Sequence, residues 1–175
     1  MNTKTKSGQR EKDFNGGIQN GTTAFDDDSK RLDAYLKESY KSLKEDFPDF
    51  EVVGMFNKQM KLDLVGDACF GFAPDGGVWF KDGKLVAVFE AKKQGKGGNA
   101  YERWWDNAMT AKYINPDVKY VTFCTGEGAG EGECLDKMRR KAKIMMGENF
   151  PMHLKVEAFT RQEVLDIMTE TLLSI

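Results

Sequence analysis

The sequence predicts an α/β protein with a mixed β-sheet that is flanked by helices on both faces. Short β-prone segments in the first half of the chain are followed by alternating helical and strand-like segments. One predicted strand is apolar on both faces, as expected of a central strand that is covered on two sides. A chain of 175 residues suits one domain with one sizeable core. We expect a flexible polar segment over residues 1–25 and one folded domain over residues 26–175.

The elements follow from local patterns. Residues 29–47 predict an amphipathic helix whose apolar stripe comprises Leu32, Tyr35, Leu36, Leu43 and Phe47. Thr160 and Glu163 have the spacing of a capping box, which opens a final helix. The other predicted elements are strands at 52–56 and 61–65, a hairpin at 78–89, a helix at 100–114, a strand at 118–125, a helix at 135–146 and a strand at 153–159. In the helix at 100–114 the expected core face comprises Trp104, Trp105, Ala108 and Met109.

The hairpin is predicted by two apolar runs that only Asp82 and Gly83 separate. An Asp-Gly pair between such runs favours a tight type I′ turn, which sets the strand register. Counting outward from this turn pairs Lys81 with Lys84, Phe80 with Leu85, Trp79 with Val86 and Val78 with Ala87. The same count places Asp75 opposite Glu90.

Two opposed carboxylates destabilise a strand pair unless something offsets their repulsion. Lys92 lies two residues beyond Glu90 and therefore points to the same face. The remaining negative charge suits a hard divalent cation, with Mg²⁺ the usual occupant, which would activate a water beside a phosphate. The alternative is a hairpin whose two acids lie at a wet strand end and bind nothing. The opposite face is wholly apolar, and the acid-bearing face is expected to carry Trp79, Val86 and Val88 as well. This apolar character of both faces favours a site at the edge of a core.

The neighbouring residues resemble a known family. Asp75 followed by Glu90-Ala91-Lys92 is similar to the active-site pattern of the PD-(D/E)xK nuclease superfamily. The Pro-Asp-Gly-Gly segment at 74–77, the Gln-Gly-Lys segment at 94–96 and the Gly-Asn-Ala-x-Glu-Arg segment at 98–103 resemble the EcoRI/MunI-like branch of type II restriction endonucleases. The matched motifs cover residues 74–103, and the order of the later elements is compatible with a restriction-endonuclease-like fold.

The resemblance implies roles for these residues. Asp75 and Glu90 bind Mg²⁺ together with Ala91, and Lys92 positions or deprotonates the attacking water. The implied DNA-binding residues are Lys93, Lys96, Gly98, Asn99, Ala100, Tyr101, Glu102 and Arg103. They would read an inner AATT sequence in the major groove. A further catalytic acid on the first helix, Glu38 or Glu45, is suggested by the same analogy, and a solvated helix face is the alternative.

Asn99 also has a purely structural interpretation. It follows two glycines and precedes Glu102 by three residues, which is typical of a helix N-cap with a capping-box partner. The two roles are compatible, because a helix N-terminus presents N–H groups to phosphates and base edges. Asn pairs bidentately with adenine, whereas Arg most often pairs with guanine. An adenine contact by Arg103 therefore rests on the resemblance alone.

The charge distribution allows DNA binding although the net charge is −2. Residues 137–143 carry Lys137, Arg139, Arg140, Lys141 and Lys143 without an acid, so this run is a candidate contact to the DNA backbone or simply a solvated helix face. Glycines at 126–132 fit no phosphate-binding pattern, and three glutamates in and beside the loop would repel a pyrophosphate. We expect a flexible surface loop there.

The cysteine count and hydropathy favour a soluble cytoplasmic protein without disulfides. Cys69, Cys124 and Cys134 are odd in number and contain no Cys-x-x-Cys pair. A zinc set with His153 matches no known finger spacing, so we expect core cysteines. No apolar run reaches the length of a membrane span, and the N-terminus lacks a signal-peptide core.

The leading hypothesis is a Mg²⁺-dependent type II site-specific endonuclease that cuts double-stranded DNA as a homodimer at a palindrome. A cognate DNA methyltransferase would be its expected partner in a restriction system. The alternative of another class is a non-cleaving DNA-binding or regulatory protein that retains the nuclease fold. A third possibility is an unrelated α/β domain.

Overall fold

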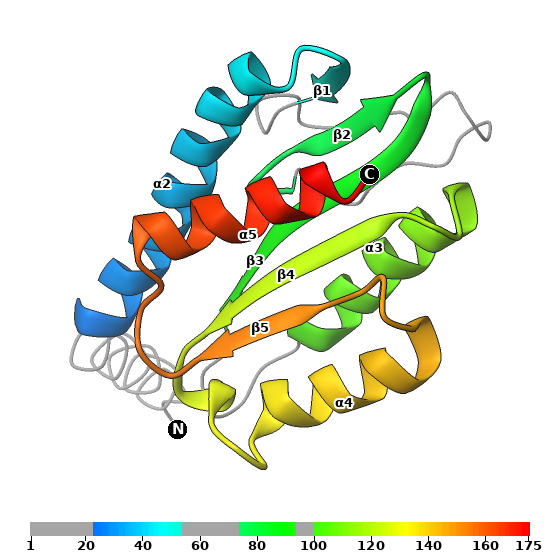
Figure 1. Cartoon of the computed structure of the whole chain (residues 1–175). Coiled ribbons are helices and arrows are strands. Elements are labelled where there is room, and N and C mark those ends of the chain that lie inside the picture. The colour runs from blue at the N-terminus through cyan, green and yellow to red at the C-terminus, as the bar shows by residue number, and fades with distance from the viewer. Residues whose placement is uncertain (1–22, 54–73, 94–99) are drawn as a thin grey trace, which may run out of the picture.

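A computed structural model describes residues 23–53, 74–93 and 100–175. Its elements, in chain order, are α2 (Thr23–Asp46), β1 (Phe50–Val53), β2 (Val78–Lys81), β3 (Lys84–Lys93), α3 (Ala100–Ile114), β4 (Lys119–Thr125), the short 3₁₀ helix η2 (Glu127–Ala129), α4 (Cys134–Met146), β5 (Met152–Lys155) and α5 (Arg161–Leu173). The predicted α/β class is confirmed (Figure 1). The predicted strand at 61–65 and most of the segment 1–25 lie outside the described residues.

The sheet has five strands in the order β1-β2-β3-β4-β5. The pairs β1–β2 and β2–β3 are antiparallel, while β3, β4 and β5 run parallel to one another. The sheet is therefore mixed, as predicted. Because parallel strands end at the same edge, the carboxyl ends of β3, β4 and β5 lie together, and Lys93 is level with Thr125.

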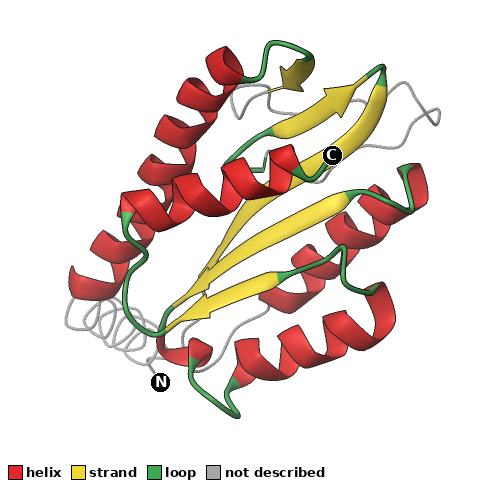
Figure 2. Ribbon diagram, viewed as in Figure 1, coloured by secondary structure: helices red, strands yellow, loops and turns green. Residues whose placement is uncertain are grey.

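Helices cover both faces of this sheet (Figure 2). On one face, α2 and α5 pack over a cluster that includes Leu36, Trp79, Phe89 and Met168. On the other face, α3 and α4 enclose a second cluster, which includes Trp104 and Tyr120. In Figure 1 α5 crosses in front of β3 and β4, whereas α3 passes behind the sheet. The central strand β3 contributes apolar side chains to both clusters, which confirms its predicted central position.

The hairpin register departs from the prediction at one point. The turn itself is as predicted, because Asp82 and Gly83 both have positive φ (52° and 73°), and the pairs of Lys81 with Lys84 and Phe80 with Leu85 are present. Beyond them the register shifts, so that Trp79 pairs with Ala87 and Val78 with Val88. The predicted pairs of Trp79 with Val86 and Val78 with Ala87 are therefore wrong.

The physical cause is one extra residue in β3, Val86, which forms a β-bulge. The bulge also reverses part of the expected side-chain alternation. Val88 packs in the α3–α4 cluster, whereas Trp79 and Ala87 pack under α2 and α5. The prediction that Trp79 shares a face with Val88 is therefore wrong. A count from a two-residue turn detects no extra residue further along the strand.

A second irregularity offsets the first. Phe89 accepts a hydrogen bond from the Gly76 N–H (2.9 Å) and donates one to the Gly77 carbonyl (3.3 Å), so it faces both glycines. Two residues of the segment before β2, Gly76 and Gly77, therefore face one residue of β3. This second irregularity cancels the register shift at Val86, so Asp75 comes level with Glu90. The Trp79 Nε1–H donates to the Gly76 carbonyl (3.0 Å) and holds the segment in place.

Gly76 is required by this close approach. A Cβ added at Gly76 would lie 2.6 Å from the Phe89 Cβ. Gly76→Ala is therefore expected to cost about 1–3 kcal/mol of unfolding free energy, because the two strands must separate. Gly130→Ala is the matched control, since its Cβ would meet nothing closer than 3.5 Å and its φ is −69°. Urea denaturation of both variants tests this; a Gly76→Ala midpoint equal to that of Gly130→Ala would contradict it.

The remaining predicted elements agree with the structure in most cases. The helix predicted at 29–47 is α2, which begins earlier, and the capping box of Thr160 and Glu163 is present. Met109 is 45 % exposed rather than in the core, because α3 turns it away from the face that carries Trp104. The last predicted strand is too long: β5 ends at Lys155. No helix among the described residues is both long and apolar enough to cross a bilayer.

Candidate active site

Glu90 is a fully buried carboxylate near the end of β3. Its Oε2 accepts a short hydrogen bond from the Tyr120 hydroxyl, and its Oε1 forms an ion pair with the Lys92 ammonium. Burial raises the pKa of Glu90 to about 7, although Lys92 and Tyr120 favour the ionised form. Burial of a carboxylate costs folding free energy, and carboxylates with strongly raised pKa values are common at functional sites. Glu90 is therefore a candidate functional residue.

Asp75 lies beside Glu90 in the segment that precedes β2. Its Oδ2 accepts a hydrogen bond from the Ala91 N–H (3.0 Å), which ties the segment to β3. Burial raises the pKa of Asp75, while this hydrogen bond and the charge of Lys92 oppose the shift. The negative charge of Asp75 in turn contributes to the raised pKa of Glu90. The two carboxylates and the lysine therefore form one electrostatic unit at the carboxyl end of β3.

A third carboxylate joins this unit from α2. Burial raises the pKa of Asp33 to about 6, and the charge of Asp75 is the second cause. Lys37 and Lys93 lower the same pKa, so these two basic side chains also lie near the site. Glu38, by contrast, is exposed, and its Oε2 lies 3.1 Å from Arg161 Nε in a surface ion pair. Glu45 is also exposed. The sequence analysis missed Asp33.

A signal for Asp33 was present in the helical spacing. Asp33 directly follows the buried Leu32 and precedes the buried Leu36 by three residues, which places it on the flank of the stripe that packs against the sheet. Glu38 and Glu45 have no such relation to the stripe and are exposed. The neighbourhood of Asp75, however, depends on how α2 crosses the sheet, and helical periodicity does not contain that information.

The donor set suits Mg²⁺. Carboxylate oxygens of Asp75 and Glu90, the Ala91 carbonyl and waters are the hard ligands that Mg²⁺ takes. Glu90 Oε1 is paired with the Lys92 ammonium and Oε2 with the Tyr120 hydroxyl, and each carboxylate oxygen keeps a second lone-pair site that a cation can take. Within the described ranges no group of three or more His, Cys, Asp or Glu side chains converges as a metal cluster. A cation at this site would take its ligands from the carboxylate pair, the Ala91 carbonyl and waters.

Tyr120 acts as a positioning residue for Glu90. It is fully buried, stacks on Phe150 at 5.8 Å, and meets the Trp104 ring edge-on. Desolvation and the charge of Glu90 raise the pKa of Tyr120, so its hydroxyl remains a donor. This contact fixes the orientation of a proposed metal ligand.

Tyr120→Phe is expected to weaken the apparent Mg²⁺ affinity about 10–100-fold, because removal of a hydrogen bond to a metal ligand has effects of this size. The ring stays, so packing on Phe150 is retained. Titration of Mg²⁺ against the melting temperature of the purified protein checks this. A variant with an unchanged Mg²⁺ midpoint would show that the hydroxyl only satisfies Glu90. Tyr113→Phe, at an exposed tyrosine of α3, is the control.

The structure describes part of the predicted DNA-reading segment. Lys93 is half-buried at the end of β3, and Glu102 and Arg103 are exposed in the first turn of α3. Ala100 opens α3 and Tyr101 follows it. Lys96, Gly98 and Asn99 lie outside the described residues, so the cap and the base contact assigned to Asn99 stay predictions.

Two of the three cysteines lie among the described residues. Cys124 is a buried free thiol and Cys134 a half-buried one, and burial raises the pKa of Cys124 far above its usual value. Core packing is therefore confirmed for Cys124, while Cys69 lies outside the described residues. The glycine-rich stretch contains η2 and turns: the Gly126 carbonyl accepts from Ala129 N–H at 3.0 Å, and Gly130 from Glu133 N–H at 3.1 Å.

Comparison of the chain with protein-family models, with curated proteins and with solved structures found no match. Functional assignment therefore depends on the chemistry of the site and on the motif resemblance.

Proposed function

We propose that the protein is a Mg²⁺-dependent, site-specific DNA endonuclease of the PD-(D/E)xK type. The observation that supports this most is the convergence of Asp75, Glu90 and Lys92 at one end of a central strand, with two carboxylates kept there against the cost of burial. A binding protein has no need for buried carboxylates at a surface that approaches phosphates, because their charge repels the DNA.

Each residue has a distinct task in the proposed reaction. Asp75 and Glu90 hold the metal through their carboxylates, with the carbonyl of Ala91 beside them. A bound Mg²⁺ supplies an activated water and stabilises charge on the phosphate oxygens. Lys92, whose ammonium lies against Glu90, orients the attacking water and stabilises negative charge as it develops. Asp33 adds a third carboxylate near Asp75.

A digest of mixed-sequence DNA with Mg²⁺ and with EDTA tests the proposal. Discrete fragments that form only with Mg²⁺ support a site-specific nuclease. Shifted DNA without cutting in either condition would favour the non-cleaving DNA-binding protein. If the DNA is neither cut nor shifted, both hypotheses are overturned. The purified full chain is used, so that residues outside the described ranges are present.

The proposed specificity is a palindrome that contains AATT, cut by a homodimer. It is supported by the Gly-Asn-Ala-x-Glu-Arg sequence at 98–103 and by the position of α3, which begins at Ala100 within this sequence and exposes Glu102 and Arg103. Selection of cleaved sequences from a random pool tests the point. A consensus without AATT would overturn this specificity but leave the proposed chemistry intact.

A further inference from the structure

A polar cavity lies beside the amino-terminal half of α4. It is lined by Ala129, Glu131, Asp136, Arg139, Arg140 and Leu154. These residues come from η2, the following turn, α4 and β5. None of them belongs to the carboxylate site, although the two sites lie at the same edge of the sheet.

A buried aspartate holds both arginines of this cavity. Asp136 is only 4 % exposed, and its Oδ1 accepts from Arg139 Nη2 at 2.6 Å while its Oδ2 lies 2.9 Å from Arg140 Nη2. The Gly132 N–H also donates to Oδ2, at 3.0 Å. This hydrogen bond and the two guanidinium groups lower the pKa of Asp136, so the carboxylate stays ionised.

The arginines are oriented but still accessible. Their side chains are 49 % and 59 % exposed, and two guanidinium groups carry more N–H donors than one carboxylate can accept. Because Asp136 already orients the two side chains, less side-chain conformational entropy is lost when a ligand binds them. A planar, oriented guanidinium pair is suited to the oxygens of a phosphate.

Strand register places this cavity relative to the carboxylate site. Lys92 of β3 pairs with Cys124 of β4, and Cys124 pairs with Leu154 of β5, which lines the cavity. Two strand spacings separate Lys92 from Leu154, or about 10 Å. Charges of both Lys92 and Arg139 act on the Cys124 thiol, which agrees with this placement. This separation places the cavity within reach of a DNA backbone that is cut at the carboxylate site.

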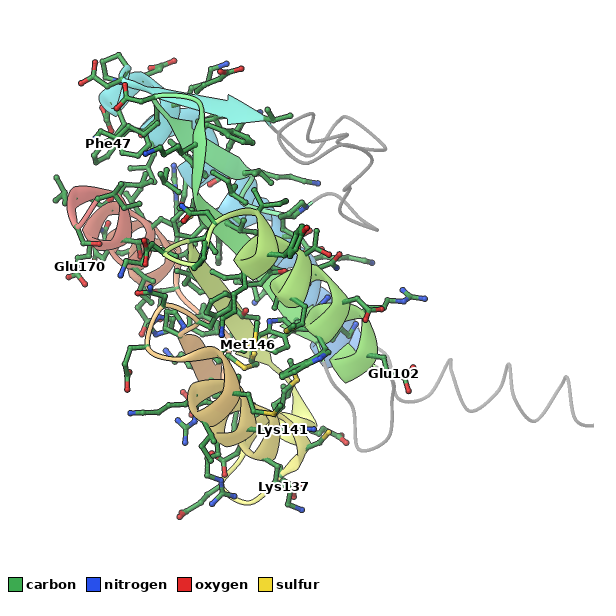
Figure 3. All side chains as sticks on the ribbon, turned by 90° about the vertical axis from the view of Figure 1, so that its right-hand side faces the viewer. Phe47, Glu102, Lys137, Lys141, Met146 and Glu170 are labelled. Atoms are coloured by element: carbon green, nitrogen blue, oxygen red, sulfur yellow. The ribbon has the colours of Figure 1, made fainter. Side chains whose placement is uncertain are left out.

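We propose that Arg139 and Arg140, oriented by Asp136, bind a phosphate of the DNA backbone close to, but not at, the cleaved bond. The inference rests on the proposed nuclease function and assigns part of its DNA-binding surface. The contact carries no base information and serves to position the duplex. The basic side chains labelled on α4 in Figure 3, Lys137 and Lys141, do not line the cavity. Lys141 lies over the Trp105 ring of α3 at 5.6 Å.

Glu131 provides a test of opposite sign. Its exposed carboxylate lines the same cavity and should repel the bound phosphate. Glu131→Gln is therefore expected to tighten DNA binding, whereas Arg139→Gln with Arg140→Gln should weaken it. Lys143→Gln is the matched control, because it removes one positive charge from the same helix at an exposed pair with Glu148 that lies outside the cavity.

Binding of a labelled duplex is measured by fluorescence anisotropy in EDTA over a series of salt concentrations. Each phosphate contact contributes about 0.9 to the slope of log K against log salt. We expect the double arginine variant to lose about 1–2 from this slope, and Lys143→Gln to keep the wild-type value. Cleavage at saturating protein should change little, because the contact does not involve the reacting atoms.

The outcomes separate this inference from the proposed function. A wild-type protein that neither binds nor cuts DNA overturns the nuclease proposal. A wild-type protein that binds, together with a double arginine variant of unchanged slope, overturns only the phosphate contact. Because loss of both arginines leaves Asp136 buried without them, Arg140→Gln is measured as well; it keeps the Arg139–Asp136 pair and should show about half of the slope change.

Discussion

Asp75→Asn is expected to abolish DNA cleavage while DNA binding stays at least as tight as in the wild type. Loss of an anionic metal ligand removes several kcal/mol of transition-state stabilisation, or about a thousandfold in rate or more. The asparagine carbonyl oxygen can still accept the hydrogen bond from the Ala91 N–H, so the segment should keep its position. In EDTA, the variant has one negative charge fewer beside the phosphates and should not bind more weakly.

Asp82→Asn is the matched control for this change. Asp82 is exposed at the hairpin turn, at the far end of β3 from the site, and has a φ of 52°. Asparagine tolerates this left-handed conformation. Cleavage assays with Mg²⁺ and gel shifts in EDTA compare the two variants. Cutting by Asp75→Asn within tenfold of the control would exclude Asp75 from the metal site.

Local patterns predicted the elements of this fold well, because turns, caps and periodicity act over a few residues. The Asp82-Gly83 turn, the capping box of Thr160 and the apolar stripe of α2 are all present. The register of the hairpin was less predictable. Val86 enters β3 as an extra residue, and nothing in an alternating apolar run distinguishes a bulged valine from a paired one.

The site was predictable where its residues share one hairpin. Asp75 and Glu90 come together because two irregularities of the strand pair compensate, at Val86 and at the two glycines that face Phe89. Residues from other elements were missed. Tyr120 reaches Glu90 from β4 and Asp33 approaches Asp75 from α2, and both contacts depend on how distant segments pack in the folded chain.

Glu90→Gln is expected to abolish cleavage and to remove a pH dependence from the stability of the metal-free protein. Burial raises the pKa of Glu90 from 4.5 to about 7. Between these values the folded state binds more protons than the unfolded chain, so the unfolding free energy of the wild type falls as pH rises. At 1.36 kcal/mol per pKa unit, Glu90 accounts for a fall of about 3 kcal/mol at most, complete above pH 7.

The difference in stability between the two proteins isolates this effect. Asp33 also has a raised pKa, but it is present in both and its contribution cancels. In the variant, the charge of Lys92 still lowers the pKa of Asp75 and favours its ionised form. Urea denaturation in EDTA at several pH values should therefore show the wild type losing stability relative to Glu90→Gln between pH 4.5 and 7. Parallel curves would mean that Glu90 titrates as an ordinary exposed acid. Glu102→Gln, at an exposed acid of α3, is the control.

Addition of Mg²⁺ at pH 8 should reverse the order of the two proteins. The ionised Glu90 of the wild type destabilises the metal-free fold but is the form that a cation binds. A ligand that binds only the folded state stabilises it by RT ln(1 + [L]/Kd), about 2.7 kcal/mol at a hundredfold excess over Kd. The melting temperature of the wild type should thus rise with Mg²⁺ concentration, while that of Glu90→Gln stays constant. A wild-type melting temperature that does not respond to Mg²⁺ would contradict a metal site at Asp75 and Glu90, whatever the DNA assays show.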